Sequence, residues 1–350
     1  MLSFSSVFMI AYWNMNSRER IMTALAGRKT DRVPFMEMGI DWAVIKDLGY
    51  SSYLKMIEDM NLDGVCVNQM LYVLGWRRWV IPHLKYYTDE WGVKSRMTGE
   101  LLPIPVGHPI PSPDFLKGFK PPRPEKSPLI KAVRHVRRRF PDRAVAVLSR
   151  NDFAASWYLC GMDVLMMSFV DNPDFADRLS EMVSDYYTRL FCLCIQAGAD
   201  IIYLTDDYAF KTSTLMSREH FKRFVLPWLT RGVKAVHDAG GICIKHTDGD
   251  ISGILDLIVD TGIDGLGPLE PAAGNNLVEL RKTLGAKVAL LGNVDVDLLS
   301  RGSIDDVRSV TQTLVRELGP RGGFILSSGN TITASVKPEN FRAMVESGRE

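Results

Sequence analysis

The stretch Ile242-Cys-Ile-Lys-His-Thr-Asp-Gly-Asp250 decides how the fold of this chain is interpreted. Apolar residues and one lysine, which has a long aliphatic side chain, lead directly into His246, Asp248 and Asp250, and Gly249 lets the backbone turn. This pattern predicts a buried strand that ends in side chains able to bind metal or move protons. In a parallel barrel, function lies at that end of a strand. Because His246 and Asp248 are two residues apart, an extended strand would point both to the same side, where we expect the chemistry.

Short apolar runs of this kind alternate with longer helical patterns along the whole chain. Near-continuous apolar strands that alternate with helices predict a parallel sheet, and eight of them with polar tips predict a single-domain (β/α)₈ TIM barrel. A doubly wound open sheet is the alternative, but the GxGxxG signature that would favour it is missing. The predicted strands are Val33–Ile40, Gly64–Asn68, Ala144–Arg150, Asp200–Asp207, Ile242–Gly249, Gly262–Glu270, Val288–Asp295 and Gly323–Asn330. The clearest helices are predicted at Arg18–Leu25, Pro173–Ala197 and Ser217–Ala239.

Two segments fall outside this alternation. Residues 84–128 combine an aromatic, polar run with a proline-rich passage, which predicts a β-hairpin and an extended excursion inserted between the second and third strands. Residues 1–14 are apolar but have neither a basic leader nor a clear cleavage site. We therefore expect residues 15–350 to form the barrel domain and residues 1–14 to be an N-terminal extension that need not be ordered.

Composition excludes several classes of partner. The chain has 350 residues, is 46% hydrophobic and 24% charged, and has a formal net charge of +1. This balance gives no electrostatic reason to propose nucleic acid or an anionic membrane as a partner. The five cysteines are scattered and form no CxxC pair, which argues against a zinc finger or a thioredoxin-like site and favours the reducing cytoplasm.

Several short motifs, taken in their order and spacing, resemble the uroporphyrinogen decarboxylase superfamily from about Arg18 to the C-terminus. They include Asp89-Glu-Trp-Gly92, Phe224-Val-Leu-Pro-Trp228 and Gly292-Asn-Val-Asp295. The resemblance implies a TIM barrel, which agrees with the strand count. One branch of the superfamily decarboxylates the acetate arms of uroporphyrinogen without a cofactor. The other comprises cobalamin-dependent methyltransferases, which move a methyl group between a small substrate and a corrinoid carried on a separate protein.

The decarboxylase branch is disfavoured at three positions that the resemblance picks out. Its arginine-rich substrate loop corresponds here to Phe35-Met-Glu37-Met-Gly39, which has no arginine. Asn68 stands where the decarboxylases have an aspartate that binds pyrrole nitrogens, and Asn330 stands where they have a histidine. A polycarboxylate substrate would therefore meet a carboxylate instead of cations, which is costly unless the charge is neutralised.

The methyltransferase branch typically binds zinc through His-x-Cys at the fifth strand and Gly-Cys at the eighth. Here these positions read His246-Thr-Asp248 and Gly329-Asn330, so the histidine is kept and both thiolates are lost. A harder set of His246, Asp248 and a carboxylate such as Glu37 or Asp206 could still hold zinc. Such an oxygen-rich site suits polarising an ether or alcohol oxygen better than activating a thiol.

The sequence therefore predicts a methyltransferase that moves a methyl group from a small methylated substrate, with a methoxylated aromatic as the leading guess, to the cob(I)alamin of a corrinoid protein. The chain has no corrinoid-binding Asp-x-His-x-x-Gly motif of its own, so cobalamin would come from this partner. A decarboxylase-like lyase and a non-catalytic binding barrel are the alternatives, and a homodimer is the oligomer considered. The predicted catalytic residues are His246, Asp248, Asp206 and Asp207, the substrate-binding residues are Asn68, Asn330 and Tyr208, and the metal ligands are His246, Asp248 and Glu37. Because adjacent strand residues point to opposite faces, only one of Asp206 and Asp207 is expected to line the barrel mouth.

Overall fold

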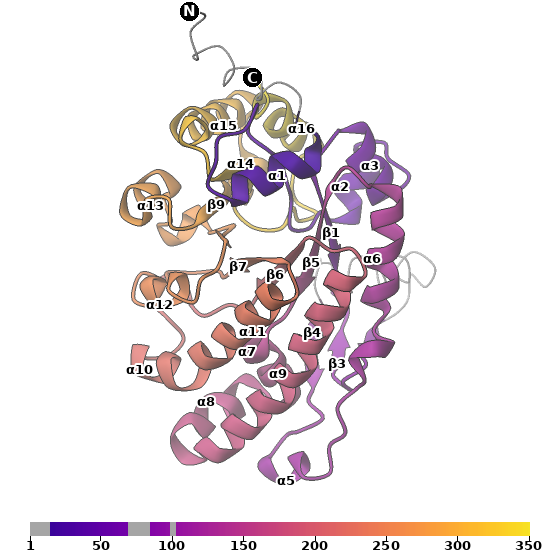
Figure 1. The fold of residues 1–350 in the computed structure, drawn as a ribbon, viewed down its shortest axis with the longest axis vertical. Helices are drawn as coiled ribbons and strands as arrows, with labels where there is room; N and C mark the ends of the chain where they lie inside the picture. The colour runs from indigo at the N-terminus through magenta and orange to yellow at the C-terminus, as the bar shows by residue number, and fades with distance from the viewer. Residues whose placement is uncertain (1–14, 69–84, 99–102) are drawn as a thin grey trace, which may run out of the picture.

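The structure of the protein is a computed structural model that describes residues 15–68, 85–98 and 103–350. The prediction for residues 1–14 therefore concerns a segment outside the described residues. Within them, short strands alternate with helices as the sequence predicts, and the helices pack around the outside of a central sheet (Figure 1).

The central sheet is curled, parallel and seven-stranded, in the order β1-β5-β6-β7-β8-β9-β10. Its strands are β1 Gly64–Asn68, β5 Ala144–Ser149, β6 Ile201–Thr205, β7 Ile242–His246, β8 Gly265–Leu266, β9 Ala289–Val294 and β10 Phe324–Ser328. The α-helices are α1 Ser17–Leu25, α2 Trp42–Asp47, α3 Tyr53–Asp59, α5 Pro113–Leu116, α6 Pro128–Arg139, α7 Asp152–Cys160, α8 Met162–Asp171, α9 Pro173–Gln196, α10 Arg218–His220, α11 Leu226–Asp238, α12 Leu255–Val259, α13 Leu277–Leu284, α14 Val296–Arg301, α15 Ile304–Leu318 and α16 Pro338–Ser347. Every strand of this sheet falls inside a strand range predicted from the sequence.

The first predicted strand, Val33–Ile40, is wrong as a regular strand. It makes only isolated parallel bridges, of Phe35 to Leu326 and of Ile40 to Ile332. The physical reason is that Pro34 has no backbone N–H to give to a ladder, although its carbonyl accepts from the N–H of Leu326 at 2.9 Å. On the other side, the carbonyl of Phe35 accepts from the N–H of Asp63 at 3.1 Å, just before β1. The segment therefore lies between the two edge strands of the curled sheet.

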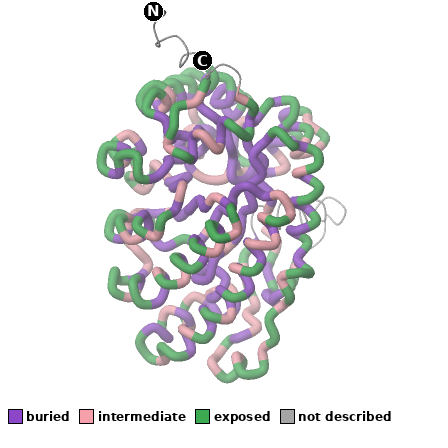
Figure 2. The backbone as a smooth tube through the Cα atoms, viewed as in Figure 1, coloured by how far each residue is buried: buried purple, intermediate pink, exposed green. Residues whose placement is uncertain are grey.

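The core has two layers, and alternate residues of each strand belong to different layers. One layer faces the inside of the curl and includes Cys66, Ala146, Tyr203 and Ile244, with the apolar face of α1 packed at its end. The other layer fills the space between the strands and the surrounding helices. Figure 2 shows this buried backbone concentrated at the centre of the molecule. The alternation matters for function because it decides which residues at the strand tips can reach the mouth of the sheet.

A second sheet lies apart from the first. Its antiparallel strands are β2 Tyr86–Thr88, β3 Lys94–Arg96 and β4 Ile104–Gly107, within the region where a hairpin was predicted. Trp91 anchors this small sheet on α9, since its ring centroid lies 4.8 Å from that of Tyr186 and 6.2 Å from that of Tyr187. The small sheet therefore stands beside the carboxyl ends of the central strands.

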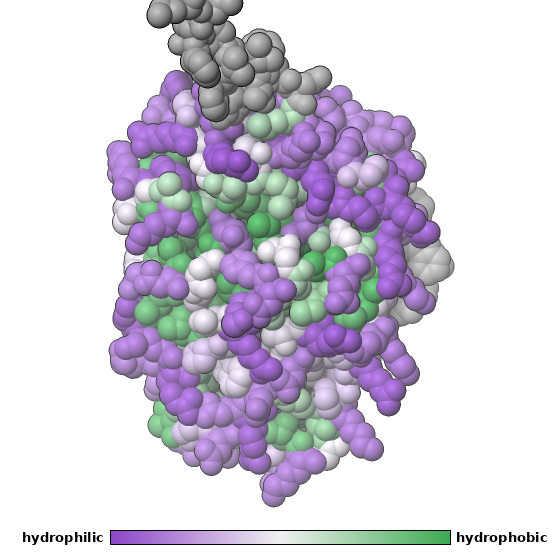
Figure 3. All heavy atoms as spheres, in the orientation of Figure 1, coloured by the Kyte–Doolittle hydropathy of each residue, from purple (hydrophilic) through white to green (hydrophobic). Residues whose placement is uncertain are grey.

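The face in Figure 3 is largely hydrophilic, with apolar areas visible between the polar side chains. No single helix among the described residues is long and apolar enough to cross a membrane. The bent pair of α7 and α8, whose axes differ by 103°, passes that test only when both helices are taken together and by length and composition alone.

Candidate active site

The carboxyl ends of the central strands surround one cavity of about 510 Å³. The alternation within each strand brings Asn68, Arg150, Asp207 and His246 to it, because they continue the inward-facing series of β1, β5, β6 and β7. Asp248 and Asn330 also line this cavity. Five of the residues predicted for the site therefore meet in one place, at the end of the sheet where parallel α/β enzymes carry function.

His246 is buried and held in one orientation. Its Nδ1 lies 2.8 Å from the carbonyl oxygen of Pro268, and since a carbonyl can only accept, Nδ1 must carry a hydrogen. Its Nε2 faces two carboxylates, at 3.5 Å from Asp248 Oδ1 and 3.7 Å from Asp207 Oδ1. The unshared side of the imidazole therefore faces two carboxyl groups, an arrangement in which the three side chains could bind one metal ion.

Asp248 is the most strongly perturbed carboxyl at the mouth. Burial raises its pKa to about 6, with Asp207 and Glu270 adding repulsion, while His246 and the amide of Asn330 oppose the rise. Asn330 Nδ2 lies 3.0 and 3.1 Å from the two oxygens of Asp248 and 3.1 Å from Oε1 of Glu270. Asn330 therefore fixes the Asp248 carboxyl, and Asp248 can hold a proton close to neutral pH.

Gly249 makes this arrangement sterically feasible. Its φ is +85°, and a Cβ at this position would lie 2.5 Å from the backbone oxygens of Ala209 and Phe210. The loop after β7 therefore packs directly on the loop after β6, and the backbone N–H of Asp248 donates to Asp207 Oδ1 at 3.0 Å. A glycine is required here because any side chain would separate the two loops.

Asp206 and Tyr208, predicted for catalysis and substrate binding, lie outside the cavity. Asp206 belongs to the outward-facing series of β6, and its Oδ1 accepts from the N–H of Asn151 at 2.8 Å. Burial raises its pKa. Tyr208 is fully buried and packs edge-on against Phe153 and Phe221. Of the adjacent aspartates, only Asp207 reaches the cavity, as the expected alternation requires.

Glu37, predicted as a metal ligand, does not lie with the other two. Its neighbours Met36 and Met38 face the inside of the curl, so Glu37 points the opposite way, toward Ser328. Its carboxyl accepts from the backbone N–H of Ser328 at 2.8 Å and from the hydroxyl of the same residue at 2.7 Å. Burial raises its pKa to about 8, which leaves it mostly neutral at pH 7.

Asp207 takes the place that the sequence analysis gave to Glu37. Asp207, His246 and Asp248 each offer one ligand atom, and these atoms all lie within 4.8 Å of one another. The carboxylate-imidazole-carboxylate set and the fixed Nδ1–H of His246 suit a zinc ion held through Nε2. The group could therefore hold a metal ion without sulfur ligands.

The sequence analysis missed another part of the cavity lining. Arg150 was seen only as the polar tip of a predicted strand, yet its side chain lines the cavity beside Asp89. An aromatic wall accompanies it, formed by Tyr87, Trp91, Trp157, Tyr158, Tyr186 and Tyr187. Arg150 lies two positions after the inward-facing Leu148 and so follows the same face, but the sequence alone does not mark which face of β5 turns inward.

A barrel-like α/β fold with titratable side chains at its carboxyl end defines the class of the protein as an enzyme of the α/β type. The pattern of the family described as uroporphyrinogen decarboxylase (URO-D) matches residues 87–350, and the chain belongs to this family. The sequence expectation of this family is thereby confirmed.

Curated relatives and a solved structure are similar to the chain in different ways. The uroporphyrinogen decarboxylases of Chlorobium phaeobacteroides and Chlorobaculum tepidum are each 28% identical, over 185 and 184 residues that cover 51% of this chain and 50% of theirs. The chain thus matches about half the length of these relatives. A methyltransferase from Methanosarcina mazei superposes with a TM-score of 0.72 at 20% identity, over 96% of this chain and 98% of that protein. This likeness supports the fold.

Proposed function

We propose that the protein is a methyltransferase that takes a methyl group from a methoxylated aromatic compound and passes it to a corrinoid protein. The observation that carries this proposal is the cluster of Asp207, His246 and Asp248 at one end of a cavity with an aromatic wall. The wall suits a flat ring, and the cluster suits an oxygen that gains negative charge. The fold shared with the Methanosarcina mazei methyltransferase is consistent with this chemistry.

The chemical task of the site is to stabilise a poor leaving group. When the methyl carbon leaves the ether oxygen, the bonding electron pair stays on that oxygen as a phenolate. The corrinoid of the partner protein would supply the nucleophile that accepts the methyl group. Asp248, whose pKa of about 6 lets it carry a proton near neutral pH, can donate to the oxygen. Asn330 holds the Asp248 carboxyl in place for that donation.

A zinc ion would be held by Asp207, His246 and Asp248, and it would supply Lewis-acid stabilisation to the same oxygen. Two backbone groups of the chain would keep these ligands in position. Pro268 fixes the tautomer of His246 through its carbonyl, and the backbone N–H of Asp248 holds the carboxylate of Asp207. Asp207 remains the most accessible of the three, with 55% of its side chain exposed.

A decarboxylase-like lyase is the second candidate because the family and its curated relatives carry that name. The charges in the cavity argue against it. Among the described lining residues, Asp89, Glu90, Asp207 and Asp248 are acidic and Arg150 is the one Lys or Arg. A porphyrinogen with many carboxylates would face net repulsion in this cavity.

The first prediction concerns metal content and methyl transfer in His246→Ala and Asp248→Ala. We expect zinc bound to the wild-type protein to be lost in both variants, and methyl transfer from a methoxylated aromatic to cob(I)alamin to fall by about 10²-fold or more. Elemental analysis and the phenol released measure the two effects. Asp250→Ala is the matched control, because Asp250 lies in the same loop but outside the cavity. Decarboxylation of a porphyrinogen without any methyl transfer would contradict the proposal.

A further inference from the structure

Arg150 occupies a distinct position in the cavity. It follows β5 on the inward-facing side, and only 25% of its side chain is exposed. The guanidinium carbon lies 3.7 Å from the ring centroid of Tyr158, so the aromatic ring covers one face of the group. A guanidinium stacked in this way keeps its N–H donors in the plane of the group, where a ligand can meet them edge-on.

The donors of Arg150 have no hydrogen-bond acceptor in the part of the chain that the structure describes. The nearest carboxylate oxygen, Asp89 Oδ2, is 3.8 Å from Nη1, which is too long for a hydrogen bond. The other oxygen of Asp89 is engaged elsewhere, because it accepts from the N–H groups of Trp91 and Val93 at 3.0 Å each. The side chain is only partly exposed, and an anion bound in the cavity would give these donors a charge-assisted hydrogen-bond partner.

The other charges in the cavity would set the orientation of such an anion. Among the described lining residues, Asp207 and Asp248 lie beside His246, Asp89 lies 3.8 Å from Arg150, Glu90 is also acidic, and Arg150 is the one Lys or Arg. An anionic group is therefore repelled from Asp207 and Asp248 and attracted to Arg150. An aromatic ring in the cavity would meet aromatic side chains of its lining such as Trp157 and Tyr187.

We propose that Arg150 is a specificity-determining residue that binds a carboxylate on the aromatic substrate and so directs the methoxy group toward His246. This inference rests on the proposed methyltransferase function, whose substrate class it narrows to aromatic carboxylates. Arginine is suited to this task because its planar donors match a carboxylate in a bidentate manner.

The test is calorimetric binding of 4-methoxybenzoate and of the neutral 4-methoxybenzamide, without corrinoid. We expect Arg150→Gln to weaken binding of the benzoate by about tenfold or more and to leave binding of the amide nearly unchanged. Arg150→Lys should recover part of the loss, because it keeps the charge but loses the planar fork. Asp89→Asn should tighten binding of the benzoate, since it removes a negative charge beside the guanidinium and keeps an acceptor for the turn.

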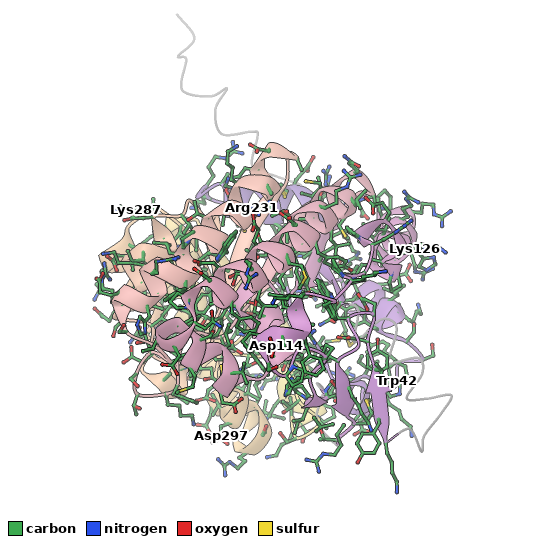
Figure 4. All side chains as sticks on the ribbon, turned by 90° about the horizontal axis from the view of Figure 1, so that it is seen from below. Trp42, Asp114, Lys126, Arg231, Lys287 and Asp297 are labelled. Atoms are coloured by element: carbon green, nitrogen blue, oxygen red, sulfur yellow. The ribbon has the colours of Figure 1, made fainter. Side chains whose placement is uncertain are left out.

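Arg231→Gln is the matched control. Arg231 lies on the outer helix α11 (Figure 4). Its guanidinium carbon is 6.0 Å from the ring centroid of Trp228, and its guanidinium group forms an ion pair with Asp185. The Arg231→Gln variant should bind 4-methoxybenzoate with the affinity of the wild type. A wild type that binds the benzoate no better than the amide, or not at all, overturns the inference, as does equal weakening of both ligands by Arg150→Gln. If the benzoate binds through Arg150 but no methyl group is transferred to cob(I)alamin, the proposed function is overturned. If methyl transfer occurs equally well in wild type and Arg150→Gln, only this inference is overturned.

Discussion

Glu37 is a carboxyl group whose environment keeps it neutral. It is 2% exposed, it accepts hydrogen bonds from Ser328, and burial raises its pKa from 4.5 to about 8. The folded state therefore binds a proton that the unfolded chain releases between these two values. The stability that this proton contributes is fully present below about pH 4.5 and is lost as the pH rises toward 8, at up to about 1.4 kcal/mol per pH unit.

The second prediction follows from this proton. Glu37→Gln should remove that dependence, so that the variant gains stability relative to wild type as the pH rises from 5 to 8. Denaturant unfolding at several pH values measures the difference. Glu58→Gln is the control, because Glu58 is an exposed partner of Arg139 and should leave the pH dependence as in wild type. Parallel pH profiles for Glu37→Gln and wild type would show that Glu37 is ionised in the fold.

The sequence could predict which strand ends carry the residues around the cavity, but not which of two adjacent residues faces the cavity. His246 and Asp248 were found because they end an apolar run, and the structure brings them within 3.5 Å of each other. The sequence could not tell Asp206 from Asp207, because both follow the same apolar run and nothing marks which face of β6 turns inward. Glu37 was misplaced for the same reason, since its segment is apolar on both faces.

Elements were predicted more securely than residues, with one exception that has a local cause. Strands such as β5 and β6 are buried on both faces, so their continuous apolar runs were enough to find them. The segment Val33–Ile40 has a similar composition, but Pro34 interrupts the ladder and leaves isolated bridges. The small sheet was expected as a hairpin, and its third strand follows residues that the structure does not describe.

The third prediction concerns the attachment of the small sheet to α9. Trp91 is 5% exposed and packs on Tyr186 and Tyr187, which line the cavity. Trp91→Ala would remove this contact, whose loss in a core costs about 3–5 kcal/mol. We expect faster hydrogen exchange in β2 and β3 and weaker binding of aromatic ligands, with less change in the strands of the central sheet. Trp91→Phe, which keeps a ring in the same place, should largely restore both, and unchanged exchange in β2 and β3 would contradict this role.

At the scale of the whole molecule, a buried ion-pair cluster and the candidate active site lie at opposite ends of the central strands. The amino end is held by Asp63, which is fully buried just before β1. Its carboxylate accepts from Arg20 on α1 at 2.6 Å, from Arg32 at 2.8 Å, and from the backbone N–H of Phe35 at 3.0 Å. One carboxylate thus joins α1, β1 and the irregular segment that lies between the sheet edges.

The fourth prediction separates the two ends. Asp63→Asn would leave Arg20 and Arg32 without their shared anion, and breaking a buried pair in this way costs about 3–5 kcal/mol. We expect a lower Tm and a lower free energy of unfolding, with ligand affinity in the folded protein within about twofold of wild type, because the cavity is at the other end of the strands. Asp59→Asn is the matched control, since Asp59 pairs with Lys55 on an exposed helix surface, where solvent screens the charges and the loss of the pair should change stability little. Ligand affinity that falls together with stability in Asp63→Asn would show that the two ends of the fold are coupled.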